Sequence, residues 1–362
     1  MKIVFVLENY IPHIGGVEVV FKTLAENLAK KHDVSIVTHR LKGTKKYEVI
    51  KDVKVHRVSC FKNRYLFSFL AIPKVLSLAK KADIIHTTTY NGAVPARLAA
   101  KLLGKPSLIT VHEVMGKRWR SLTGMNLFSA KLHEFLEYLV ISLRFDRFVC
   151  VSRSTQKNLY KNKKRSLVIY NAVDYGHFNP AKHKKRPKKT FTYLTYGRPG
   201  ISKGIEYVVK AVPLVDIKGS KLMLILSKDK AYRKRYGYIV GLIRKLKIED
   251  KVILHDPVSY KELPSYIRSA DCVIVPSLTE GFGFTVAESC AMGIPVVASN
   301  TTSIPEVISG KYLLVRPRSP KEIAQAIKKV HKKQYKTSKP KRFLIKDNVD
   351  CYLKVYRELT RK

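Results

Sequence analysis

The feature that most limits the fold of this chain is an alternation of short β-branched runs with helical patterns. The run KIVFVL begins at Lys2, and a stretch with Val20, Leu24 and Leu28 at helical spacing follows it. Further buried-strand candidates, separated by helical stretches such as VPARLAAKLLG, read DVSIVT, VKVHRV, ADIIHT, KPSLITVH and DRFVCVS. Because strands that alternate with helices form parallel sheets covered on both faces, we predict an α/β fold.

The alternation stops near residue 180 and then starts again. The segment 180–189, PAKHKKRPKK, has no apolar periodicity and is typical of a solvated linker or an exposed loop. After it come the strand candidates FTYLTYG, KLMLILS, KVILH, DCVIVPS and PVVAS. A chain of 362 residues is long enough for two domains. We therefore predict a Rossmann-like domain over 1–172, a basic linker over 173–190, a second Rossmann-like domain over 191–345, and a C-terminal helix over 346–362 that could pack back on the first domain.

Composition points to an anionic partner. The chain carries 70 Lys and Arg against 27 Asp and Glu, a formal charge of +43, so lipid head groups and nucleic acid are both candidate partners. The sequence has no run of 18 apolar residues, so we predict no membrane-spanning helix. The first residues do not resemble a signal peptide. Five scattered cysteines without CxxC spacing favour a reduced, cytoplasmic setting.

Two strand-to-helix turns carry glycines and cations suited to an anionic ligand. In NYIPHIGGVE, Gly15 and Gly16 let the backbone approach a ligand at a helix start, although a simple tight turn would also use them. In TYGRPGISKG, Arg198 and Lys203 follow Gly197 at the end of a strand. They could hold phosphate oxygens or could be solvated surface residues. GxGxxG and Walker A motifs are absent, which argues against NAD and P-loop chemistry.

The stretch EGFGFTVAE, residues 280–288, follows the strand candidate DCVIVPS. Its glycines predict a turn and FTVAESCAMG predicts a helix, whose first N–H groups suit a phosphate. Glu280 and Glu288 would then accept hydrogen bonds from separate parts of one ligand, although a cap and a surface residue would give the same spacing. His112, at the end of SLITVH, is either structural or catalytic. DxD and clustered His and Cys are absent, so no metal site is expected.

Together these motifs resemble the retaining glycosyltransferases of family 4. This family has the GT-B fold, two facing Rossmann-like domains with a cleft between them. The blocks that carry the resemblance span nearly the whole chain in the expected order: IPHIGGVE, TVHE, VSRSTQKNL, IYNAVDYGHF, YGRPGISKG, PSLTEGFGFTVAESCAMGIPVVAS and IPEVI. The chain departs from the family pattern at Ser289 and Ala172, where alanine and glycine are usual. Both changes exchange one small residue for another.

The resemblance implies hexose transfer from a nucleoside-diphosphate sugar, with retention and without a metal cofactor. Glu288 would bind the ribose hydroxyls, Glu280 the sugar hydroxyls, and Arg198 and Lys203 the diphosphate. His112 would contact the donor sugar, and no general base is assigned. The remaining donor-binding positions implied by the family are Gly15, Gly16, Gly197, Gly281, Phe282, Gly283, Phe284 and Thr285.

Two basic segments bear on the acceptor. Residues 61–81 mix Phe67, Phe69, Leu70 and Ile72 with cations, and residues 116–128 place the only tryptophan beside three basic residues. Such segments suit an anionic membrane interface, although helices packed on a sheet would also explain them. Because lipid-linked acceptors are common in the family, we expect a peripheral enzyme on the inner face of the membrane. The alternatives are a basic nucleic-acid-binding protein, which would lack a recognisable binding module, and a sugar-nucleotide epimerase on a similar fold.

Overall fold

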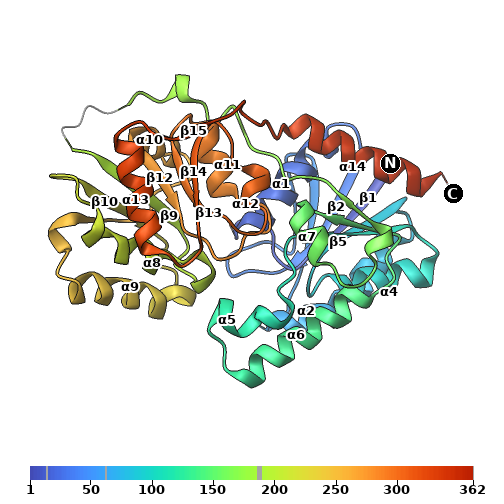
Figure 1. Cartoon of the computed structure of the whole chain (residues 1–362). Coiled ribbons are helices and arrows are strands. Elements are labelled where there is room, and N and C mark those ends of the chain that lie inside the picture. Colours follow the sequence, from blue (N-terminus) through green and yellow to red (C-terminus); the bar gives the residue numbers. More distant parts are fainter. Residues whose placement is uncertain (14, 62, 186–189, 362) are drawn as a thin grey trace. The chain divides into compact units, whose positions relative to one another are not determined.

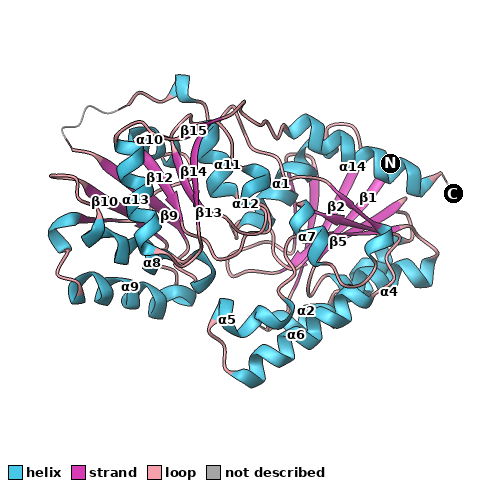
Figure 2. Cartoon of the chain, viewed as in Figure 1, coloured by secondary structure: helices cyan, strands magenta, loops and turns pink. Residues whose placement is uncertain are grey.

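The chain folds into two compact units. The computed structural model describes residues 1–13, 15–61, 63–185 and 190–361 (Figure 1). Unit 1 comprises Met1–Lys117, Leu127–Ala172 and Phe343–Lys362, and unit 2 comprises Arg118–Asn126 and Val173–Arg342. Each unit has its own sheet, with helices on both faces (Figure 2).

Unit 1 is built on an eight-stranded sheet in the order β3-β4-β2-β1-β5-β6-β7-β8. Neighbouring strands are parallel except for the antiparallel edge pair β3–β4. The apolar runs form the central strands because both faces of a parallel sheet are covered by helices. The strands are β1 (Lys2–Leu7), β2 (Asp33–His39), β3 (Tyr47–Ile50), β4 (Val53–Val58), β5 (Ile84–Thr88), β6 (Ser107–Val111), β7 (Arg147–Cys150) and β8 (Ser166–Val168).

Two apolar clusters fill the space between the unit 1 sheet and its helices. One contains Phe21 of α1 together with Tyr352 of α14, and the other contains Val75 of α3 together with Ala96 of α4. The α-helices of this unit are α1 (Gly16–Ala29), α2 (Phe67–Leu70), α3 (Ile72–Ala79), α4 (Ala93–Leu103), α6 (Leu127–Ser142), α7 (Arg153–Asn158) and α14 (Ile345–Thr360).

A buried polar network joins α14 to the unit 1 sheet. His86 Nδ1 on β5 lies 2.6 Å from the Tyr356 hydroxyl, and His86 Nε2 lies 2.8 Å from Thr110 Oγ1. Thr110 Oγ1 is in turn 3.0 Å from the Tyr352 hydroxyl. Burial holds the pKa of His86 well below its usual range. The C-terminal helix is therefore held in unit 1 by hydrogen bonds as well as by apolar packing.

Unit 2 is built on a seven-stranded sheet in the order β11-β10-β9-β12-β13-β14-β15. Its neighbours are parallel except for the short antiparallel pair β14–β15. The strands are β9 (Thr192–Gly197), β10 (Lys221–Leu226), β11 (Val252–His255), β12 (Cys272–Val275), β13 (Val296–Ser299), β14 (Lys311–Val315) and β15 (Lys336–Thr337). Its α-helices are α5 (Trp119–Thr123), α8 (Ile205–Ala211), α9 (Arg233–Lys245), α10 (Leu263–Ser269), α11 (Phe284–Ala291), α12 (Ile304–Val307) and α13 (Pro320–His331).

The unit boundaries differ from the predicted domains in three places. Residues 343–345, expected in the second domain, belong to unit 1 together with the C-terminal helix. Residues 118–126, expected in the first domain, belong to unit 2, where α5 packs against the 3-10 turn Ile201–Lys203. Residues 173–185, expected as part of the basic linker, belong to unit 2. There Phe178 is buried and the His177 ring stacks on Tyr260 at 4.2 Å. The rest of the basic run, residues 186–189, lies outside the described residues.

The two segments predicted to contact a membrane differ in what they expose. Trp119 is buried, so the only tryptophan does not stand at the surface. In the other segment Phe67 is buried, whereas Phe69 and Leu70 are exposed. Within the described part of the chain, every helix is too short or too polar to cross a bilayer.

Candidate active site

The predicted site residues of unit 2 gather where β9 and β12 end. These strands are parallel neighbours, so the loops after Gly197 and Val275 leave the same edge of the sheet. The loops are tied together because Leu278 N donates to Ser202 O at 2.7 Å. Gly204 makes this approach possible: its φ is +61°, and a Cβ there would lie 2.3 Å from Pro276 O.

Lys203 and Glu280 form an ion pair at this edge. Lys203 Nζ lies 2.7 Å from Glu280 Oε1, and Ser277 Oγ donates to the same oxygen at 2.7 Å. The Glu280 backbone is also held, since its N–H donates to Thr302 Oγ1 at 2.9 Å. The Glu280 side chain is 10% exposed and that of Lys203 31%. Solvent therefore reaches the ammonium more readily than the carboxylate, and an incoming anion can compete for Lys203.

The glycine turn after Glu280 leads into α11. Ser303 Oγ donates to the carbonyl oxygens of Glu280 and Phe282, both at 2.9 Å, which fixes the turn. Gly283, at φ +99°, is the N-cap of α11, and as a glycine it has no side chain with which to cap the helix start. The positive end of the helix thus lies beside the Lys203–Glu280 pair. Phe284 and Thr285 are half-buried in its first turn.

Glu288 is paired with a residue that the sequence analysis did not identify, Tyr196. The Tyr196 hydroxyl donates to Glu288 Oε2 at 3.0 Å and lies 3.2 Å from Thr285 O. Although Glu288 as a residue is half-buried, its carboxyl group lies deep enough that burial raises its pKa to about 7, against the opposing effects of Tyr196 and Lys203. Burial and the nearby Glu288 charge raise the pKa of Tyr196 well above its usual range.

Ser289, where the family usually has alanine, adds a hydroxyl group that finds a hydrogen-bond acceptor within its own helix. Its Oγ donates to Thr285 O one turn earlier, at 2.7 Å. The hydroxyl is therefore satisfied within α11. Arg198, the other predicted cation, follows Gly197 directly and is exposed. Gly197 has a φ of +123°, a conformation that glycine adopts readily and other residues rarely adopt.

The predicted residues of unit 1 form a separate group around the start of α1. Gly15 is the N-cap with extended backbone at φ −149°, so the alternative of a left-handed turn does not hold at this position. Gly16 begins the helix, and the Glu18 carboxylate in its first turn lies 3.2 Å from His13 Nδ1. His112, directly after β6, packs its ring on Phe21 of the same helix at 6.0 Å.

His112 has the properties of a neutral hydrogen-bonding group. Burial lowers the pKa of His112 to about 4, while the Glu18 charge acts in the opposite direction. Its Nε2 is buried and makes no hydrogen bond to the residues that the structure describes. A buried polar atom without a partner is unusual and is a position where a ligand group can bind. A purely structural role for His112 would not explain why this nitrogen is buried without a partner among the described residues.

A buried carboxylate at the end of β1 was also missed from the sequence. Glu8 accepts a hydrogen bond from Asn91 Nδ2 at 2.8 Å and lies 2.9 Å from Arg64 Nε. A single acid after a strand carries little signal by itself, because its partners are 56 and 83 residues away. In the described part of the chain, no three His, Cys, Asp or Glu side chains come together in a way that could hold a metal ion.

Comparison with known proteins identifies the family. The family described as "Glycosyltransferase Family 4" matches residues 14–177, and "Glycosyl transferases group 1" matches residues 178–346. The two matches are contiguous and contain every predicted site residue. The chain belongs to the family 4 glycosyltransferases. The predicted resemblance is thereby confirmed, and the protein is a glycosyltransferase.

Individual relatives agree with this assignment. An uncharacterised glycosyltransferase of Methanocaldococcus jannaschii is 26% identical over 358 residues, covering 91% of this chain and 89% of the relative. The α-monoglucosyldiacylglycerol synthase of Streptococcus pneumoniae is 27% identical over 332 residues, covering 86% and 74%. The crystal structure of Anabaena HepE with UDP and glucose has a TM-score of 0.78 at 16% identity, covering 99% and 100%. This similarity confirms the predicted GT-B fold.

Proposed function

We propose that this glycosyltransferase moves a hexose-type sugar from a nucleoside-diphosphate sugar to a lipid-linked acceptor, with retention of configuration and without a metal ion. The observation that carries the proposal is the arrangement at one sheet edge in unit 2. There Lys203 is paired with Glu280, and Glu288 with Tyr196, on either side of the start of α11. One edge thus offers a cation, a helix start and two carboxylates, which would accept hydrogen bonds from the hydroxyl groups of a donor.

The donor would lie along this edge with its diphosphate at the start of α11. Glu288 would accept hydrogen bonds from the ribose hydroxyls, and Glu280 from the sugar hydroxyls. Lys203 would exchange its bond to Glu280 for a phosphate oxygen, and Arg198 would add a second cation. HepE, whose structure was solved with UDP and glucose, has the same fold and supports a donor of this class.

Charge stabilisation of the leaving group would supply most of the catalysis. As the bond between the anomeric carbon and the phosphate oxygen breaks, negative charge develops on the diphosphate. Lys203, Arg198 and the helix start would stabilise it. The acceptor oxygen forms the new bond on the same face, and the departing phosphate oxygen takes its proton. In unit 1, the unpaired Nε2 of His112 would bind a hydroxyl of the transferred sugar.

The proposed acceptor rests on the net charge of the chain and on the name of one relative. The formal charge of +43 favours an anionic surface, and the pneumococcal relative is named for a glycosylated diacylglycerol product. We therefore propose a lipid-linked acceptor at the inner, anionic face of a membrane. A nucleic-acid-binding protein would share the charge but would have no use for carboxylates placed beside Lys203.

The decisive experiment incubates the full chain with a panel of sugar nucleotides, a membrane lipid extract and EDTA. We expect release of a nucleoside diphosphate and a lipid product heavier by one hexose, identified by mass spectrometry. Glu288→Ala should lower kcat/KM for the donor by about a hundredfold or more, because it removes charged hydrogen bonds of about 1.5–3 kcal/mol each. The exposed Glu249 provides a matched control as Glu249→Ala, which should behave like wild type.

Different outcomes separate the alternatives. Interconversion of two sugar nucleotides without any acceptor would identify an epimerase. Loss of activity in EDTA that Mg²⁺ or Mn²⁺ restores would contradict the metal-independent mechanism. Product formation by Glu288→Ala at the wild-type rate would exclude the proposed donor site.

A further inference from the structure

The outward face of α6 is apolar, although it is exposed. Phe128, Leu132, Phe135 and Leu139 repeat at spacings of four, three and four residues, and their exposed fractions are 80%, 45%, 56% and 44%. These four residues are called the α6 face below. The buried residues of α6 lie on its other side, at Ala130, Glu137, Val140 and Ile141. A helix with an apolar face toward solvent normally has a partner there.

The neighbouring turn of unit 1 extends this surface. The Tyr65 hydroxyl lies 3.3 Å from His133 Nε2 of α6, which places the 3-10 turn Arg64–Leu66 against the helix. This turn and the following α2 expose Leu66 and Phe69. Figure 1 shows α2 beside α6. The exposed apolar side chains therefore come from α6, the 3-10 turn and α2.

A cluster of cations adjoins the C-terminal end of α6. Asn162 Nδ2 donates to Ile141 O at 2.7 Å and to Leu143 O at 3.3 Å, which fixes the following loop to the helix end. The Tyr138 ring of α6 stacks on Tyr160 with centroids 6.1 Å apart, and Lys161 Nζ lies 5.8 Å from the Tyr138 ring centroid. The loop exposes four cations, Lys161, Lys163, Lys164 and Arg165.

The acids of α6 do not offset these cations at the surface. Glu137 is buried and accepts hydrogen bonds from the backbone N–H groups of Met115 and Gly116, at 2.8 and 2.7 Å. Glu134 is paired with Lys131 at 2.8 Å. The surface therefore combines an exposed apolar stripe with positive charge at one end that the acids of α6 do not neutralise.

We propose that the α6 face and the loop 161–165 form a docking surface for an anionic lipid bilayer. The aromatic and leucine side chains would enter the boundary between head groups and acyl chains, and the cations would contact lipid phosphates. This proposal rests on the proposed function, since it supplies the surface that brings the enzyme to a lipid-linked acceptor. It overlaps the sequence-based expectation, which placed the contact in residues 61–81 and 116–128, only at Phe128 and at the adjoining Leu66 and Phe69. The rest of the surface, on α6 and the loop 161–165, lies outside both segments.

Charge favours a bilayer over a second copy of the chain. A symmetric dimer through the α6 face would bring the same surface of each copy together, and with it two basic loops. Their like charges would repel each other, and the same repulsion opposes a basic protein partner. An anionic bilayer instead pairs with both the apolar and the cationic parts.

The test measures sedimentation of the full chain with vesicles of phosphatidylglycerol and phosphatidylcholine, and with phosphatidylcholine alone, across a salt series. Phe128→Gln/Phe135→Gln should lower the partition coefficient to anionic vesicles on the order of a hundredfold. The variant loses the free energy that the wild type gains when two aromatic side chains move from water into the bilayer. Leu214 and Ile253 of unit 2 are also exposed apolar residues, at 47% and 39%, so Leu214→Gln/Ile253→Gln serves as the control and should bind like wild type.

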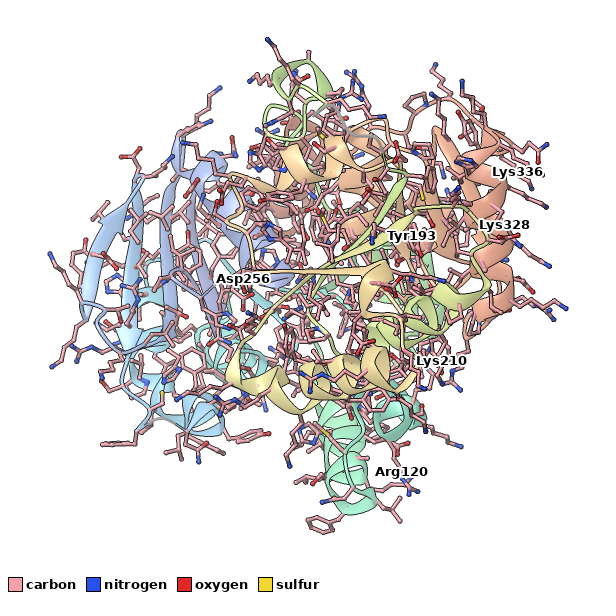
Figure 3. All side chains as sticks on the ribbon, turned by 90° about the vertical axis from the view of Figure 1, so that its left-hand side faces the viewer. Arg120, Tyr193, Lys210, Asp256, Lys328 and Lys336 are labelled. Carbon is pink, nitrogen blue, oxygen red and sulfur yellow. The ribbon has the colours of Figure 1, made fainter. Side chains whose placement is uncertain are left out.

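The cations are tested in the same way. Lys163→Gln/Lys164→Gln/Arg165→Gln should weaken binding on the order of a hundredfold at low salt and flatten the salt dependence. The control removes three exposed lysines from the end of α13 and the turn after it, Lys329→Gln/Lys332→Gln/Lys333→Gln. In Figure 3 the nearby Lys328 and Lys336 point outward from unit 2. This control should retain the α6-dependent binding.

Three results would overturn the proposal. The first is unchanged vesicle binding by the Phe128/Phe135 variant, and the second is equal weakening by the control triple. The third is a dimer in analytical ultracentrifugation that this variant dissociates without any change in vesicle binding. Failure of this proposal can be told apart from failure of the proposed function. Glu288→Ala should bind vesicles like wild type, and the Phe128/Phe135 variant should still bind sugar nucleotide. If the wild type binds vesicles through the α6 face but uses no sugar nucleotide, the docking surface is supported and the proposed function is refuted.

Discussion

Replacing Tyr196 with phenylalanine tests how the structure tunes Glu288. The change removes the hydroxyl that donates to Glu288 Oε2 at 3.0 Å and keeps the ring in place. Because this hydrogen bond favours the carboxylate and opposes the effect of burial, its loss should raise the pKa of Glu288 further above its value of about 7. A hydrogen bond to a charged group contributes about 1.5–3 kcal/mol, so the carboxylate should become about ten- to hundredfold less favoured over the acid.

The consequence should appear in how donor binding depends on pH. The carboxylate accepts ribose hydroxyls more strongly than the neutral acid does, so Tyr196→Phe should bind the donor about tenfold more weakly at pH 7. Binding should recover as the pH rises toward 9, because Glu288 then ionises in the variant too. The assay is isothermal titration calorimetry with the preferred sugar nucleotide, repeated at intervals between pH 6 and pH 9.

A buried tyrosine on the same strand provides the control. Tyr193 lies three residues earlier on β9, so Tyr193→Phe also removes a buried hydroxyl but leaves Glu288 and its partner unchanged. It should keep the wild-type pH profile. The reasoning is refuted if Tyr196→Phe also keeps that profile, or if it weakens donor binding equally at every pH. Either result would mean that the hydroxyl does not control ionisation of Glu288.

Two further predictions concern stability, measured by urea unfolding. Gly204→Ala should destabilise the protein by more than about 2 kcal/mol, because φ is +61° and the new Cβ would lie 2.3 Å from Pro276 O. Gly219→Ala, at φ +70° in open space, should lose only about 1 kcal/mol, and equal losses would refute the role of the close approach. Tyr356→Phe should lower the free energy of unfolding by about 1–3 kcal/mol, since it leaves His86 Nδ1 buried without its partner. A change below about 0.5 kcal/mol would show that this bond does not hold α14.

Strand and turn positions were predictable because they depend on neighbouring residues. Apolar runs bounded by glycine and polar residues predicted β1, β9 and β12 closely, since a parallel strand is buried on both faces. The glycines of EGFGFTVAE likewise predicted the turn before α11, whose N-cap Gly283 has a positive φ. Parallel strands end at a common edge, so the grouping of Lys203 with Glu280 also followed from the local pattern.

The sequence by itself determined the two α/β units, the family and the position of the glutamates at a strand edge. Tertiary structure alone decided which groups pair across long separations: Tyr196 with Glu288 at 92 residues, and Tyr356 with His86 at 270. It also buried Trp119, assigned residues 118–126 to unit 2 and left the apolar face of α6 exposed. The physical reason is that periodicity specifies which side of a helix is apolar. Only the packed structure specifies whether that side faces the core or the solvent.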